Sequence, residues 1–278
     1  MLFPNHPILL RGGGDLATGV AYRLHHAGFP MIVTELSRPL VVRRRVALAT
    51  AILEGEITVE SLRAVRVETP DEAWTLAHSG VIPVLVAPDV SPILNSSLVT
   101  QNSSLVIVDA RMAKRNIDTH IDQAPLVIAL GPGFTAGVDC HAVIETNRGH
   151  RLGRVIWRGA AAPNTGTPGI VAGKGRERVL RAPADGIATW RVDIGDRVQE
   201  GERMGDVAGR PVVAPFDGVV RGLIAPGMPV ASGLKIGDVD PREDGSAAFT
   251  ISDKALAIGG GVLEAVLIHL NQTGAATE

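Results

Sequence analysis

Cysteine is almost absent from this sequence, whose 278 residues include only Cys140. A single cysteine excludes an internal disulfide, and also any zinc or iron–sulfur site built from several cysteines of one chain. Aromatic residues make up only 3% of the chain. Lysine is scarce too, because the positive charge comes from 23 arginines and four lysines. The formal net charge of −2 leaves no broad basic footprint, so we expect no nucleic-acid partner.

Long apolar runs are also missing, and none reaches the roughly 18 residues that a membrane span needs. The apolar start of the chain, residues 1–10, runs directly into Arg11 and three glycines. It is too short for a signal sequence with a cleavage site. Apolar residues make up 45% and charged residues 20% of the chain, which is typical of a globular protein. We therefore expect a cytoplasmic protein with no membrane partner.

Glycine is plentiful by contrast, with 32 residues, and three of them form a turn at 12–14. The apolar run at 8–10 before this turn predicts a strand. Apolar residues at a spacing of four between Leu16 and Leu24 predict a helix after it. A second apolar run at 31–33 predicts another strand, which ends at Glu35. Strand, glycine turn, helix, strand and acid is the order of a dinucleotide-binding unit.

The glycine turn also has the chemistry of such a unit, since Gly12, Gly14 and Ala17 satisfy the pattern G-x-G-x-x-A. Glycine lets a pyrophosphate approach the backbone, helix N–H groups solvate it, and the acid accepts from a ribose hydroxyl. The residues predicted to bind the ligand here are Gly12, Gly13, Gly14, Asp15 and Glu35. The alternative is a tight strand–helix turn that binds nothing.

Two further predicted strands, 105–109 and 125–130, end in polar or glycine-rich segments. Ligands of open α/β sheets bind at the carboxyl ends of the strands, so an anion is expected there. The residues predicted to bind it are Arg111, Lys114, Arg115, Gly131, Gly133, Thr135 and Gly137. The alternative is that 131–137 is a structural loop. The polar turn at 147–151 is placed to close over a site.

Asp139, Cys140, His141 and Glu145 resemble a metal cluster, but residues 141–145 alternate like a strand. This alternation favours a structural histidine and no metal site. Cys140 is interpreted as a core residue. Asp109 and His141 are the candidates for acid–base catalysis. No nucleophile, base and orienting group occur together at a recognisable spacing, so it stays open whether the protein is an enzyme.

A duplication with an offset of 32 residues is the most informative feature of the second half, where 182–186 recurs at 214–218. The pattern resembles the two half-motifs of lipoyl/biotinyl barrel-sandwich hybrid domains. Carrier members of that group present a modifiable lysine between the halves. No lysine lies between Lys174 and Lys235 here, which argues against a carrier.

The predicted fold class is thus α/β, with a Rossmann-like, mostly parallel sheet and an inserted or appended small all-β barrel-sandwich hybrid domain. The predicted domains are 1–175 for the Rossmann-like part and 176–240 for the β-sandwich. The segment 241–278 is expected to pack back on the first domain.

Five segments together resemble one known family, and they lie at 11–19, 109–116, 130–137, 141–150 and 258–264. This family is the accessory protein of the selenium-dependent molybdenum hydroxylase system. The resemblance implies a maturation factor for a molybdenum hydroxylase, with that client enzyme as its partner. The ligand would be a small phosphate-bearing compound, either a molybdopterin-type cofactor or a nucleotide. Arginine-rich cytoplasmic α/β proteins are often dimers, so a homo-oligomer is also considered.

Two other functions stay open from the residues alone. The first is an NAD(P)-dependent oxidoreductase, with Glu35 on the ribose and His141 or Asp109 in acid–base catalysis. The second is a non-catalytic scaffold whose glycine loops are empty.

Overall fold

A computed structural model describes residues 1–94, 104–167 and 169–274. The chain divides into two compact units. Unit 1 contains Met1–Pro39, Leu48–Asn164 and Ile251–Glu278, and unit 2 contains Leu40–Ala47 and Thr165–Thr250. This division has other bounds than the predicted domains, and the boundaries at residues 175 and 240 stay a prediction.

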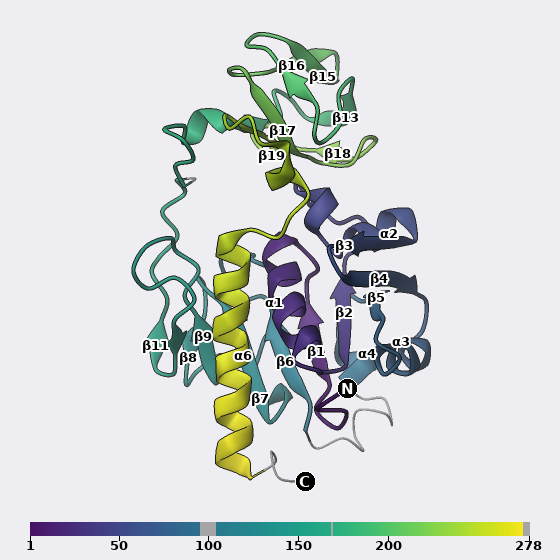
Figure 1. Cartoon of the computed structure of the whole chain (residues 1–278), viewed down its shortest axis with the longest axis vertical. Coiled ribbons are helices and arrows are strands. Elements are labelled where there is room, and N and C mark those ends of the chain that lie inside the picture. Colours follow the sequence, from purple (N-terminus) through teal and green to yellow (C-terminus); the bar gives the residue numbers. More distant parts are fainter. Residues whose placement is uncertain (95–103, 168, 275–278) are drawn as a thin grey trace. The chain divides into compact units, whose positions relative to one another are not determined.

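Unit 1 is built on a nine-stranded sheet in the order β10-β9-β7-β6-β1-β2-β5-β4-β3 (Figure 1). The inner strands are parallel, whereas β10 and β3 at the two edges pair antiparallel with β9 and β4. The strands are β1 (Ile8–Arg11), β2 (Met31–Glu35), β3 (Glu56–Val59), β4 (Leu62–Val67), β5 (Ile82–Val86), β6 (Val106–Asp109), β7 (Leu126–Leu130), β9 (Ala142–Ile144) and β10 (Val155–Ile156). A small separate sheet pairs β8 (Thr135–Ala136) with β11 (Gly159–Ala160).

The helices of unit 1 cover both faces of this sheet. They are α1 (Asp15–His26), α2 (Thr50–Glu54), α3 (Pro70–Ala77), α4 (Ser91–Leu94), α6 (Asp253–Thr273) and a 3₁₀ turn at Ile121–Gln123. The face opposite α1 and α6 is closed by α3, α4 and the loop around Phe134, which share one apolar cluster with β1, β5, β6 and β7. Because both faces of the sheet are covered, the sequences of the parallel strands are continuous runs of apolar residues.

Helix α6 lies beside α1 and also packs against β7, β9 and β10 (Figure 1). Gly19 of α1 faces Ala255, and Gly259 faces Gly19 and Arg23, so the contact advances along both helices and they run parallel. A Cβ on Gly19 would lie 2.4 Å from the backbone of Ala255, and one on Gly259 would lie 2.2 Å from the oxygen of Gly19. Glycines that weaken an isolated helix therefore allow this helix pair to approach closely.

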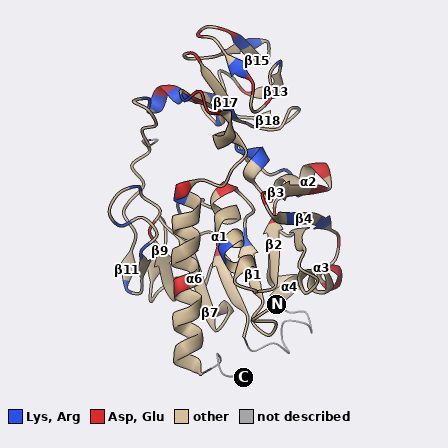
Figure 2. Cartoon of the chain, in the orientation of Figure 1, with Lys and Arg blue, Asp and Glu red and all other residues tan. Residues whose placement is uncertain are grey.

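Within the described residues, α6 is also the one helix long and apolar enough to cross a membrane, judged by length and composition. Figure 2 shows it uncharged along most of its length. In the structure one face of α6 packs on α1 and the sheet, where Ala255, Val262 and Ala265 are fully buried, whereas Leu267 is exposed. The buried face belongs to the core of an α/β fold of the kind found in soluble proteins.

Unit 2 consists of two four-stranded antiparallel sheets. One has the order β12-β19-β17-β14 and the other β16-β15-β13-β18. The strands are β12 (Val179–Arg181), β13 (Gly186–Trp190), β14 (Arg197–Val198), β15 (Arg203–Val207), β16 (Arg210–Val213), β17 (Gly218–Leu223), β18 (Pro229–Val230) and β19 (Lys235–Asp240). Short 3₁₀ helices lie at Arg44–Val46, Arg176–Arg178 and Gly245–Ala248. Residues from both sheets, such as Met204 and Val220, form one apolar core.

The fold class predicted from the sequence needs correction. The α/β class and the mostly parallel sheet are present in unit 1, but residues 110–125 between β6 and β7 contain a loop and a 3₁₀ turn where a Rossmann-like repeat has a helix. Helix α6, from the end of the chain, covers that half of the sheet instead. The structure also does not establish the barrel-sandwich hybrid domain that was predicted for 176–240. Unit 2 also needs the distant segment Leu40–Ala47, which pairs Arg43 with Leu223 and which the repeat could not reveal.

Candidate functional site

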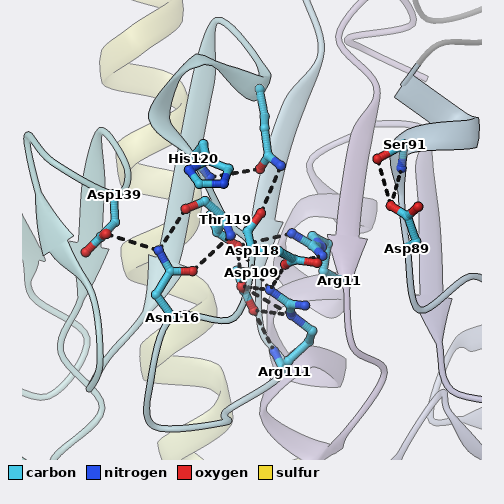
Figure 3. A network of polar contacts seen from close by, with 11 residues as sticks. Arg11, Asp89, Ser91, Asp109, Arg111, Asn116, Asp118, Thr119, His120 and Asp139 are labelled. Carbon is cyan, nitrogen blue, oxygen red and sulfur yellow. Dashed lines mark hydrogen bonds and ion pairs between the residues drawn. The ribbon is translucent and has the colours of Figure 1, made fainter.

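A buried network of polar side chains lies at the carboxyl ends of β1 and β6 (Figure 3). Asp109, only 1% exposed, is at its centre. Its Oδ2 accepts hydrogen bonds from Arg111 Nη2 and from Thr119 Oγ1, both at 2.6 Å. Arg111 also donates from Nε to Oδ1 of the same carboxylate at 3.1 Å. The carboxylate of Asp109 is thus held by charge-assisted hydrogen bonds within the protein.

A second carboxylate and a second guanidinium complete this network. Arg11, also 1% exposed, donates to Asp118 Oδ1 at 2.7 Å and to Thr119 Oγ1 at 3.1 Å. Arg111 Nη2 donates to the same Asp118 oxygen at 2.7 Å. Burial opposes ionisation of Asp118, but the hydrogen bonds from Arg111 and Arg11 outweigh it and lower its pKa. Burial likewise disfavours the charged form of Arg111, yet Asp109 and Asp118 raise its pKa.

Asn116 extends the network toward the second glycine turn. Its Nδ2 donates to Thr119 O at 2.8 Å and to Asp139 Oδ1 at 3.0 Å, and Thr119 N donates back to its Oδ1 at 2.9 Å (Figure 3). Asp139 Oδ2 accepts from Thr135 N at 2.7 Å. The structure therefore brings Asp109, Arg111 and Thr135, three of the predicted site residues, into one connected set.

The first glycine turn is closed by Glu35. Gly13 N donates to Glu35 Oε2 at 2.9 Å, and Leu36 N donates to Oε1 at 2.8 Å. A Cβ on Gly13 would lie 2.7 Å from Ala49 N, so this glycine is needed for packing. Around Gly14 a Cβ would meet nothing within 4 Å, and no side chain caps α1, which begins at Asp15. Glu35, predicted to accept from a ribose, stabilises the turn in this structure.

The glycines of the second turn, residues 131–137, are also explained by packing and backbone conformation. A Cβ on Gly131 would lie 2.3 Å from Ala161 Cβ, and one on Gly133 would lie 2.5 Å from Arg115 N. Gly133 also has a φ of 109°, and Gly137 has a φ of 86°, which favour glycine. Lys114 and Arg115 themselves are exposed. Close backbone packing explains Gly131 and Gly133 without a ligand.

His141 lies away from the other predicted residues, at the start of β9 rather than at its carboxyl end. Its Nδ1 accepts from Val127 N at 3.0 Å. Burial and the nearby His269 lower its pKa. Cys140 is fully buried, and burial together with Asp139 and Asp109 raises its pKa to about 12. Among the described residues, no group of three or more potential ligands is arranged to hold a metal ion.

A cavity of about 460 Å³ lies at the carboxyl end of β9, within unit 1. Its lining residues are Glu145, Asn147, Arg148, Gly149, His150, Arg151, Arg154, Ile156, Ala160, Ala161, Ala162 and Pro163. The turn at 147–151, expected from the sequence to close over a site, forms part of this lining. Arg154 and Ile156 were not predicted as part of a site, because the antiparallel edge strand β10 that places them has only two residues.

The lining combines basic and apolar residues. We call Arg148, His150, Arg151 and Arg154 its basic side, and Ile156, Ala160, Ala161 and Pro163 its apolar side, as names for these two sets of residues. Glu145, the only acid in the lining, accepts from Asn147 N at 2.7 Å and from Ala162 N at 2.8 Å. Both carboxylate oxygens of Glu145 are thus occupied by the backbone that shapes the cavity.

Helix α6 holds the basic loop in place. A Cβ on Gly153 would lie 2.4 Å from the oxygen of Ala257, and one on Gly261 would lie 2.0 Å from the oxygen of Gly153. Arg148 forms an ion pair with Asp253 at 2.8 Å. Lys254, next along the helix, is partly buried, and burial and the charge of Arg148 lower its pKa against the opposing effect of nearby acids. Positive charge therefore accumulates at this corner of unit 1.

The comparisons with known proteins give a relative without an assigned function. The chain is 48% identical over 283 residues to the uncharacterized protein YqeB of Escherichia coli strain K12. This alignment covers 100% of the chain but 51% of YqeB, so the chain spans about half the length of the curated relative it matches. No family model matches the sequence.

Among solved structures, matches include a succinylglutamate desuccinylase/aspartoacylase from Rhodobacter sphaeroides and an aspartoacylase family protein from Mesorhizobium loti. The first is 24% identical with a TM-score of 0.22, covering 26% of this chain and 24% of the other. The second is 13% identical with a TM-score of 0.26, covering 85% of this chain and 86% of the other. At such scores no activity is carried over from these names.

These matches contradict the family resemblance drawn from the sequence motifs. The solved structures bear desuccinylase and aspartoacylase names, and YqeB is uncharacterized. The assignment to the selenium-dependent molybdenum hydroxylase system is therefore corrected. Its client enzyme and its maturation role are withdrawn with it, and so is the alternative of an NAD(P)-dependent oxidoreductase. At Gly13 and Gly133, which belong to two of the five segments, close backbone packing requires glycine without reference to a ligand.

Proposed function

We propose that unit 1 binds a small organic anion with an apolar part in the cavity between residues 145 and 163. The observation that carries this proposal is the pairing of a basic side with an apolar side around one cavity of about 460 Å³. This volume falls in the range of small-molecule sites, which are largely apolar with a few placed polar groups.

The charge of the cavity supports an anion in particular. Within the described part of the chain, the side chains of Arg151 and Arg154 have no hydrogen bond or ion pair. Among the described residues Glu145 forms no ion pair with either arginine, and its two oxygens accept the backbone N–H groups of Asn147 and Ala162. Guanidinium groups bind carboxylates through paired hydrogen bonds, so one carboxylate on the ligand suits this side.

The apolar side supports a ligand with a hydrocarbon body. Ile156, Ala161 and Pro163 offer no charged group, and contact with them removes apolar ligand surface from water. Benzoate and longer monocarboxylates fit both sides, whereas inorganic anions fit only one. We expect affinity to rise with the apolar area of the ligand.

Isothermal titration calorimetry with benzoate, hexanoate and acetate tests this proposal. The double substitution Arg151→Ser and Arg154→Ser should weaken benzoate at least tenfold, about 1.4 kcal/mol. Arg63→Ser is the matched control, because Arg63 is an exposed arginine of unit 1 on β4, paired with Glu56. Equal binding by the double variant and the wild type would refute the site.

The binding roles predicted for residues of the glycine turns stay proposals. Gly14 is suited to test binding without disturbing the fold, because a Cβ at this position would meet no atom within 4 Å. If this turn contacts the ligand, Gly14→Val should weaken binding while the melting temperature stays within a degree or two. We also propose a cytoplasmic location, supported by the buried, unpaired thiol of Cys140.

A further inference from the structure

Unit 2 contains an arginine whose charge is buried without a hydrogen bond. Arg221 on β17 is 9% exposed, and its Nε has no partner among the described residues. Its nearest acid is Asp240, with 3.7 Å between Nη1 and Oδ2, which is an ion pair beyond hydrogen-bonding distance. Buried guanidinium groups are costly unless they are paired and hydrogen-bonded.

The backbone directs Arg221 into this position. The register between β17 and β19 shifts between Val220 and Gly222, so Arg221 lies at a bulge. Bulges reorient side chains and are treated as designed features of a sheet. Gly222 lets Val42 approach, since a Cβ would lie 2.9 Å from Val42 O. The segment Leu40–Ala47 thereby covers β17 and brings Arg43 beside Arg221.

The acids nearby are already engaged by other cations. Asp240 accepts from Arg242 Nη2 at 2.6 Å and from Arg242 Nε at 2.9 Å. Asp238 accepts from Arg178 Nη1 at 2.5 Å and lies 3.7 Å from Lys235 Nζ. Five cationic side chains therefore lie around these two carboxylates, and one of them, Arg43, also donates from Nη2 to Ala247 O at 2.9 Å and to Thr250 O at 3.1 Å. The five are Arg43, Arg178, Arg221, Arg242 and Lys235.

This imbalance affects Arg221 most. Burial, followed by the charge of Arg43, lowers its pKa, and the two aspartates do not compensate. Burial is the largest cause, so the lowered pKa reflects a desolvated guanidinium that Asp238 and Asp240 stabilise too weakly to offset burial and Arg43. Arg242 and Lys235 remain partly exposed, so the group of cations reaches the surface.

We propose that this cluster is a binding site for a small oxyanion of the phosphate type, held by Arg221 with Arg43 and Arg242. A doubly charged oxyanion supplies both the missing acceptors for Arg221 and the missing negative charge. This site lies in unit 2 and is independent of the cavity in unit 1.

Thermal unfolding in low-millimolar inorganic phosphate and in chloride at equal ionic strength tests the proposal, because higher phosphate concentrations stabilise folded proteins in general. Trp190 fluorescence reports unit 2 in a background in which Trp74 and Trp157 of unit 1 are replaced by phenylalanine. The wild type should melt several degrees higher in phosphate, as expected of a ligand that binds only the folded state. Arg221→Met should abolish this difference and leave stability in chloride unchanged or higher, because a buried charge that has no hydrogen bond among the described residues is removed. Sulfate should act like phosphate, and acetate should not.

Two controls separate this site from other effects. Arg197→Met removes an exposed arginine of β14 in the same unit and should keep the full phosphate shift. The double variant Arg151→Ser and Arg154→Ser should keep it too, which distinguishes the cluster from the unit 1 cavity. The proposal is overturned if phosphate does not stabilise the wild type, or if Arg221→Met retains the shift. Arg43→Met, which should also lose the shift, serves if Arg221→Met fails to fold.

Discussion

The thiol of Cys140 lies in the apolar core of unit 1 with no exposed surface. Because its pKa is raised to about 12, almost no thiolate exists at neutral pH. We expect a disulfide reagent such as DTNB to label the native protein very slowly and the denatured protein at once. Fast labelling of the native protein would contradict the buried position.

His141 is the second residue whose surroundings have a measurable effect. Its folded pKa lies below the usual 6.5, first because of burial and then because of His269. The stability linked to it is therefore complete above pH 6.5 and is lost as the pH falls through the folded pKa. NMR titration should show His141 below 6.5, and His269→Gln should raise its pKa. An unchanged value in that variant would mean that His269 contributes nothing.

At the scale of elements, alanine substitution of two adjacent glycines of α6 is expected to change stability in opposite directions. Gly259→Ala places a Cβ 2.2 Å from the oxygen of Gly19 and should destabilise the protein by about 1–3 kcal/mol through overpacking. At Gly260 a Cβ meets nothing within 4 Å, so Gly260→Ala should stabilise the helix by roughly 1 kcal/mol. Urea unfolding of the two variants measures both. Equal effects would argue against the close contact between α1 and α6.

The sequence pattern predicted those helices and strands that depend on residue spacing within a short segment. The spacing from Leu16 to Leu24 indicates α1, and the apolar runs at 8–10 and 31–33 indicate β1 and β2. The role of Glu35 was not predictable, because its partner Gly13 is defined by the tertiary path of the chain. The basic side of the cavity was foreseen only as a polar turn, since Arg154 depends on the two-residue strand β10. The arginines at 43–45 gave no sign that they belong to unit 2.

At the scale of the whole molecule, unit 2 is assembled from two distant segments, Leu40–Ala47 and Thr165–Thr250. Arg44 joins them by donating from Nε to Leu223 O at 2.8 Å. A fragment of residues 165–250 should therefore melt below the same fragment with 40–47 attached through a flexible linker. Circular dichroism melting compares the two, and identical melting temperatures would show that 40–47 contributes nothing to unit 2.

The pairing of α1 with α6 also sets the order of events during synthesis. Helix α1 leaves the ribosome complete by residue 26, whereas its partner begins only at residue 253. At about 5–20 residues per second, the apolar face of α1 waits roughly 10 to 50 s for its cover. During that interval the nascent chain leaves Gly19 and Arg23 without the helix that they contact in the folded unit. Of these two helices, the one made second thus covers a face of the one made first, and that face stays open until residue 273 has been synthesised.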